Sequence, residues 1–104
     1  MDNEKIQEMQ ILEQRLQNIL LQKQSFQIEL SETEGALEEI EKSEDVFKIV
    51  GNIMLKSDKN YVKKDLTEKK DMLDLRVKSL EKHEDTMNKQ VEKLRSEVMK
   101  SSKS

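Results

Sequence analysis

The side chains able to do acid–base or nucleophilic chemistry are few and poorly placed for it. His83 is the only histidine and the chain has no cysteine, so a nucleophile–imidazole triad, a His-rich metal site or a thiolate metal site is hard to build. The carboxylate pairs Glu34/Glu38 and Glu81/Asp85 have helical spacing, but no apolar pocket wall accompanies them. No glycine-rich phosphate loop supports nucleotide use. We therefore expect no catalytic residue, no metal, no cofactor and no enzymatic activity, and interpret these polar groups as solvated helix faces.

The composition indicates what kind of scaffold carries these groups. Of 104 residues, 39% are charged, 34% hydrophobic and 3% aromatic, which is thin material for a globular core. The absence of proline and the presence of only two glycines argue equally against disorder. Long helices fit, because they bury only a narrow seam. The sequence contains no run of about 18 apolar residues that would predict a membrane span. It also shows no export leader, so we expect a cytosolic protein.

The charge is divided between the two halves of the chain. Residues 1–45 carry 12 Asp and Glu against 4 Lys and Arg, whereas residues 46–104 carry 10 against 15. A nucleic-acid binder usually shows a basic stripe interleaved with aromatics, and the basic half has only Phe47 and Tyr61. Its positive excess has an acidic partner within the same chain. We therefore expect no nucleic-acid partner.

Apolar residues recur with alternating steps of three and four in both halves. In the first half, eight of the ten positions are apolar, and the positions are Met9, Leu12, Leu16, Ile19, Lys23, Phe26, Leu30, Thr33, Leu37 and Ile40. In the second, eight of eleven are apolar, and the positions are Lys63, Leu66, Lys70, Leu73, Val77, Leu80, Glu84, Met87, Val91, Leu94 and Val98. Sustained heptads predict a coiled coil. Two arms of about 40 residues would each be roughly 60 Å long.

The two arms are predicted to pair antiparallel with each other. If Met9 faces Leu94, their position numbers add to 103, and Leu30 then faces Leu73 by the same rule. Registers shifted by seven residues also match the heptads, so the register stays open. Polar residues interrupt the seam and are expected to fix register and strand number; they are Lys23, Thr33, Lys63, Lys70 and Glu84.

The stretch FKIVGNIMLK, residues 47–56, is predicted to form a β-hairpin between the arms. Its turn centres on Gly51-Asn52, and a glycine in the first central position is typical of a type II′ turn. Apolar groups point to both faces, which a two-stranded ribbon cannot bury alone. We interpret the hairpin as an assembly element that closes into a barrel with other copies. Its candidate residues are Val46, Phe47, Ile49, Val50, Gly51, Asn52, Ile53, Met54 and Leu55.

Antiparallel pairing brings the two chain ends together as a tip. Its apolar residues are Ile6, Met9, Leu12, Val91, Leu94, Val98 and Met99. Terminal turns have few neighbours and fray most easily, so these side chains are candidates for contacts with another chain. The alternative is that they simply end the seam. Outside the seam lie Gly35, Ile11, Leu21, Ile28, Met72 and Leu75, to which no role is assigned.

Residues 36–94, and most specifically VFKIVGNIMLK, resemble the β class of prefoldin subunits. The resemblance implies a mainly α fold, a long antiparallel two-helix coiled coil joined by a central β-hairpin that assembles into a β-barrel body. It implies one domain over 1–104, with helices at 1–44 and 58–100, a hairpin at 46–57 and a disordered tail at 101–104. It further implies a hexamer of two alpha and four beta subunits, which captures unfolded client proteins without ATP at its coiled-coil tips and delivers them to a group II chaperonin.

A second hypothesis needs no client. The chain would then be a structural coiled-coil adaptor that its hairpin merely oligomerises. The chemistry of the tip distinguishes the two hypotheses.

Overall fold

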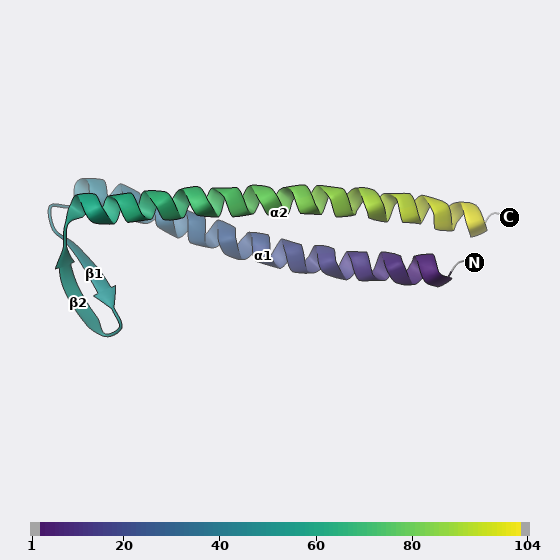
Figure 1. The fold of residues 1–104 in the computed structure, drawn as a ribbon, viewed down its shortest axis with the longest axis horizontal. Helices are drawn as coiled ribbons and strands as arrows, with labels where there is room; N and C mark the ends of the chain where they lie inside the picture. The colour runs from purple at the N-terminus through teal and green to yellow at the C-terminus, as the bar shows by residue number, and fades with distance from the viewer. Residues whose placement is uncertain (1–2, 103–104) are drawn as a thin grey trace. The chain divides into compact units, whose positions relative to one another are not determined.

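The computed structural model describes residues 3–102, which form two long helices and one hairpin. The order is α1 (Asn3–Lys42), β1 (Val46–Val50), β2 (Ile53–Ser57) and α2 (Lys59–Ser102) (Figure 1). The two strands pair antiparallel. The predicted fold class, mainly α with a central hairpin between two long helices, is confirmed.

The helix ends differ slightly from the predicted ones, and local hydrogen bonds explain why. α1 stops at Lys42 rather than at residue 44, because the Ser43 backbone N–H turns to the Ile40 carbonyl (3.1 Å) and the Ser43 hydroxyl donates to the Glu39 carbonyl (2.8 Å). Asp58 caps the start of α2 by accepting the Asn60 N–H at 3.4 Å.

The predicted disordered tail at 101–104 is only partly described by the structure. The helix α2 includes Ser101 and Ser102, two residues beyond its predicted end at 100. Residues 103 and 104 lie outside the described residues, as do residues 1 and 2 of the predicted first helix.

The hairpin has the predicted register. Val50 faces Ile53 and Ile49 faces Met54, so Gly51 and Asn52 are the two central turn residues. Gly51 has a φ of 61°, and no described residue other than glycine has a positive φ. This combination is that of a type II′ turn, which needs glycine in the first central position.

The chain divides into two compact units, each of which contains segments of both helices. One combines Met1–Ser25 with Val77–Ser104, and we call it the terminal unit. The other, Phe26–Arg76, contains the hairpin and the adjoining helix turns, and we call it the hairpin unit.

The buried residues of each unit follow the predicted seam. In the terminal unit the most buried side chains are Leu12, Val77 and Val91. In the hairpin unit Leu73 is 2% exposed, and Thr33 is buried with its hydroxyl donating to the Glu29 carbonyl at 2.8 Å. All predicted seam positions are buried or half-buried except Lys63, which is exposed and pairs with Glu41. The off-seam apolar residues are all exposed, namely Ile11, Leu21, Ile28, Met72 and Leu75.

Ion pairs link the two helices within each unit. In the hairpin unit the Lys69 ammonium lies 3.4 Å from the Glu29 carboxylate. The Arg76 guanidinium lies 5.4 Å from the centre of the Phe26 ring, within the range of a cation–π contact. In the terminal unit Lys23 and Glu84, two of the polar residues that interrupt the seam, meet across the helices at 3.1 Å.

The Lys23–Glu84 pair is expected to act as a unit. Both side chains are largely covered, at 16% and 27% exposed, so either charge alone would be poorly solvated. We expect Lys23→Met to lower the free energy of unfolding by about 1–2 kcal/mol, and Lys23→Met with Glu84→Leu to recover it. Urea unfolding followed by circular dichroism measures both variants. A single variant as stable as the wild type would show that the pair contributes no more than a surface ion pair.

Candidate functional site

The polar groups considered for catalysis do not form a site. His83 is exposed, as are both carboxylate pairs of the sequence analysis. Residues 3–102 include no group of three or more His, Cys, Asp or Glu side chains placed to hold a metal ion. Over the same residues, neither helix has an apolar stretch long enough to cross a bilayer.

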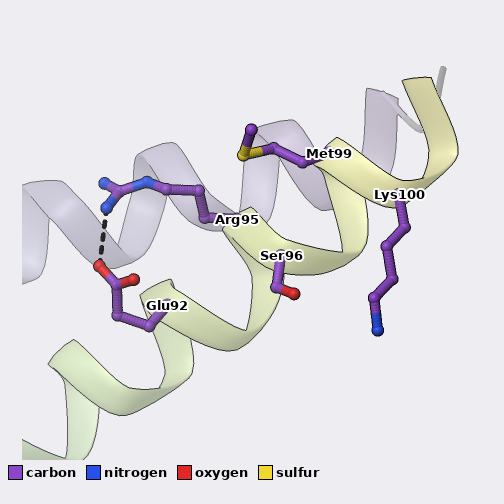
Figure 2. Close-up of a pocket in the computed structure, with 5 residues that line it drawn as sticks. All are labelled: Glu92, Arg95, Ser96, Met99 and Lys100. Carbon is purple, nitrogen blue, oxygen red and sulfur yellow. Dashed lines mark hydrogen bonds and ion pairs between the residues drawn. The ribbon is translucent and has the colours of Figure 1, made fainter. Parts of the chain in front are cut away.

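Two surface depressions are walled by α2 alone. Figure 2 shows one of them, in which all five labelled side chains come from α2. Arg95 and Met99 point to one side and Ser96 and Lys100 to the other, while Arg95 donates a hydrogen bond to Glu92 at 2.7 Å (Figure 2). A depression walled by one helix cannot surround a small molecule. The remaining candidates are the two larger surfaces that the sequence predicted, the hairpin and the paired chain ends.

The first surface is the hairpin. Phe47, Ile49 and Met54 lie on one face and Val50, Ile53 and Leu55 on the other, and every one of these side chains is at least half exposed. Ile49 is the most exposed of them at 68%, whereas Val46 is buried at the start of β1. The two-strand sheet is the whole of the β structure in the described residues. Both faces and both outer edges of the hairpin are thus available to other strands.

A charged cluster holds the base of the hairpin where α1 ends and α2 begins. The Lys63 ammonium hydrogen-bonds the Glu41 carboxylate, and the Lys59 ammonium donates to the Glu41 carbonyl at 3.4 Å. The hydrogen bond from Lys63 and its positive charge, with a smaller contribution from Lys59, lower the pKa of Glu41 below its ordinary value. A lowered pKa means that this contact stabilises the fold above the ordinary pKa of a glutamate and is lost as the pH falls through the lowered value.

The second surface is the tip, which the structure assembles from both chain ends. The first turns of α1 and the last turns of α2 lie side by side in the terminal unit (Figure 1). Two ion pairs bracket them, Lys5 with Glu97 at 3.3 Å and Arg95 with Glu13 at 3.6 Å.

Most predicted tip residues are packed in the seam. Leu12 and Val91 are buried, and the half-buried members are Ile6, Met9, Leu94 and Val98. Met99 is 56% exposed, and its side chain points to the same side of α2 as Arg95 (Figure 2). Between the helices, Leu12 and Leu94 line a groove together with Glu8, Gln90, Lys93 and Glu97. In this closed form the tip offers a groove in which two leucines lie among four polar side chains. Fuller contact with the seam requires the last turns to separate.

The sequence analysis overlooked one feature of the terminal unit and left the role of one residue in the hairpin unit unresolved. It overlooked the side of α1 that faces away from the seam, where exposed residues are uncharged; the available signal was that residues 16–28 carry one charge, Lys23. It assigned no role to Gly35, which lies in the hairpin unit. A Cβ built there meets nothing within 4 Å, so no close contact within the chain requires glycine.

Comparisons with known proteins agree with this architecture. The family model described as "Prefoldin subunit" matches residues 3–104. The chain is 40% identical over 89 residues to the prefoldin subunit beta of Pyrobaculum islandicum, covering 83% of this chain and 71% of that protein. It is 40% identical over 85 residues to the prefoldin subunit beta of Archaeoglobus fulgidus, covering 79% and 73%.

A solved structure is similar as well. The crystal structure of the prefoldin beta subunit from Thermococcus strain KS-1 superposes with a TM-score of 0.87 and 31% sequence identity, covering 93% of this chain and 88% of that one. Both the sequence and the backbone therefore point to the same family.

Proposed function

The chain belongs to the prefoldin subunit family, and on that premise we propose that it holds unfolded polypeptides without ATP and delivers them to a group II chaperonin. The observation that carries the proposal is the groove between the paired chain ends, whose lining includes the apolar side chains of Leu12 and Leu94. Unfolded chains share exposed apolar surface but no sequence, so an apolar contact is the interaction that suits them all. The proposal includes no enzymatic step, and it places the protein in the cytosol, where unfolded chains and a chaperonin would meet.

Assembly is the second part of the proposal. The partner is an alpha-class prefoldin subunit, in a hexamer of two alpha and four beta subunits whose hairpins close into a barrel. Six large apolar side chains of the hairpin are at least half exposed in the single chain. At roughly 1.5–3 kcal/mol for each fully buried side chain, covering them would stabilise an assembly by on the order of 10 kcal/mol. Several tips on one body would then bind one client with avidity, although each contact is weak.

The test is an aggregation assay with a chemically denatured client and the assembled complex, with and without ATP. We expect light scattering from the aggregating client to fall in proportion to the complex added, equally in both conditions. Suppression that requires ATP would contradict a holdase without a nucleotide site. No suppression in either condition would favour the structural adaptor, which the closed packing of the tip also fits.

A further inference from the structure

One outward stripe of α1 in the terminal unit carries no charge over three turns, and the exposed residues Glu13 and Arg15 flank it. The stripe that faces away from the seam consists of Gln10, Ile11, Gln14, Gln17, Asn18 and Leu21, and all six side chains are exposed. We call it the uncharged α1 face. Four of its members are primary amides, and its two aliphatic members, Ile11 and Leu21, are 52% and 62% exposed.

The corresponding side of α2 in the same unit is different. Its exposed residues include Lys78, Lys82, Asp85, Lys89 and Glu92, and Asp85 pairs with Lys89 at 3.1 Å. Charged residues are the usual choice on the outside of a coiled coil, and they make up 39% of this chain. Their omission from one helix face, where two large aliphatic side chains are left in water, indicates a surface that contacts something.

We propose that the uncharged α1 face binds the main chain of an extended, unfolded polypeptide and thereby continues the tip surface along α1; this rests on the proposed holdase function. A glutamine or asparagine amide both donates and accepts hydrogen bonds. Every residue of a client, except for the missing N–H of proline, offers a backbone N–H and C=O that match it. Ile11 and Leu21 add apolar contact, and Ile11 lies between the tip residues Met9 and Leu12 in sequence.

The absence of charge suits a client rather than one defined partner. A charged face attracts chains of one sign and repels those of the other, whereas an uncharged face accepts both. A second copy of this chain is a poorer occupant. Ile11 and Leu21 are ten residues apart and do not continue a heptad seam, and two aliphatic side chains provide far less than the roughly 800 Å² per partner of a stable interface.

The test introduces charge without changing net charge or helix propensity. The variant carries Gln10→Glu, Gln14→Lys, Gln17→Glu and Leu21→Lys, which place two Glu–Lys pairs at i,i+4 spacing. The matched control carries Ser79→Glu, His83→Lys, Thr86→Glu and Asn88→Lys, which likewise add two Glu and two Lys on exposed positions of α2 in the same unit. None of these four residues lines the groove at the tip. The probes are an acidic unfolded chain, reduced carboxymethylated lactalbumin, and a basic one, reduced carboxamidomethylated lysozyme.

Fluorescence anisotropy with the assembled complex measures the Kd for each probe. We expect the α1 variant to raise both values by about fivefold or more, and the α2 control to change them less than about twofold. Wild-type affinity in the α1 variant overturns this inference alone, whereas a wild-type complex that binds neither probe overturns the proposed function. A loss confined to one probe would assign the effect to the introduced charges. A change in sedimentation would assign the face to a contact between subunits, and either result overturns the inference.

Discussion

Replacing Met9, Leu12, Leu94 and Val98 with Ser is expected to abolish suppression of client aggregation while the oligomer persists. These side chains are four of the seven apolar residues of the tip, and Ser removes nearly all of their apolar surface. The four positions lie in the terminal unit, whereas the hairpin belongs to the other unit, so the proposed assembly element is untouched. The aggregation assay gives the activity, and sedimentation gives the size of the complex.

Two controls separate tip contact from general weakening of the coil. Leu12 is buried, so its replacement also loosens the last turns, and Ile19→Ser with Leu80→Ser imposes a comparable loss of packing deeper in the terminal unit. Lys93→Gln with Arg95→Gln removes only charge, including the Arg95 contacts to Glu13 and Glu92. Full protection by the four-Ser complex would place capture elsewhere. Loss only in the charge variant would make capture electrostatic.

Ile49→Lys together with Ile53→Lys is expected to disperse the oligomer into monomers whose helical signal largely survives. The two side chains lie on opposite faces of the hairpin and are 68% and 61% exposed, so a single chain tolerates lysine at both. In a barrel, one lysine ammonium would be buried in the core, and the other would be buried where the outer face of the barrel packs against the rest of the assembly. Burying a charge in this way costs several kcal/mol per charge. Sedimentation measures the size, and circular dichroism measures the helix content.

The control for this variant changes hairpin charge without adding a buried cation. Lys56 is exposed and pairs with Asp45 at 3.4 Å, so Lys56→Gln should leave the oligomer intact. An oligomer of unchanged size in the double-lysine variant would show that the hairpin is not the assembly element.

The heptad pattern predicted well which side chains are buried, because it identifies the positions of each helix that face the partner helix. A side chain that recurs at steps of three and four faces the partner helix whatever its neighbours are, and that holds for polar Thr33 as well as for Leu73. Lys63 departs from the pattern because a long cationic side chain near a helix start can turn outward to a carboxylate, here that of Glu41. The end of α1 could not be placed to the residue, since it depends on how the Ser43 N–H and hydroxyl share two carbonyls.

The candidate surfaces were less predictable than the fold. The hairpin residues could be identified because a two-sided apolar ribbon conflicts with solubility, and that conflict is visible in the sequence. At the tip, periodicity alone gives Met9 and Leu94 the same status as any other seam residue. The uncharged α1 face was missed because the heptad analysis counts apolar residues only. It does not detect Gln and Asn residues at outward positions where charged residues are expected.

The hairpin topology also makes the chain-entropy cost of closing the terminal unit larger than that of closing the hairpin unit. The ends of α1 and α2 that meet at the Lys59–Glu41 contact are 18 residues apart in sequence, whereas Lys23 and Glu84 are 61 apart. Closing the longer loop first costs about 1 kcal/mol more in chain entropy than closing the shorter one. Once the hairpin has formed, pairing of each further helix turn closes only a small additional loop. The sequence separation of paired positions therefore rises from the turn at Gly51 toward the chain ends, and chain entropy alone favours pairing of the proposed client-binding residues last.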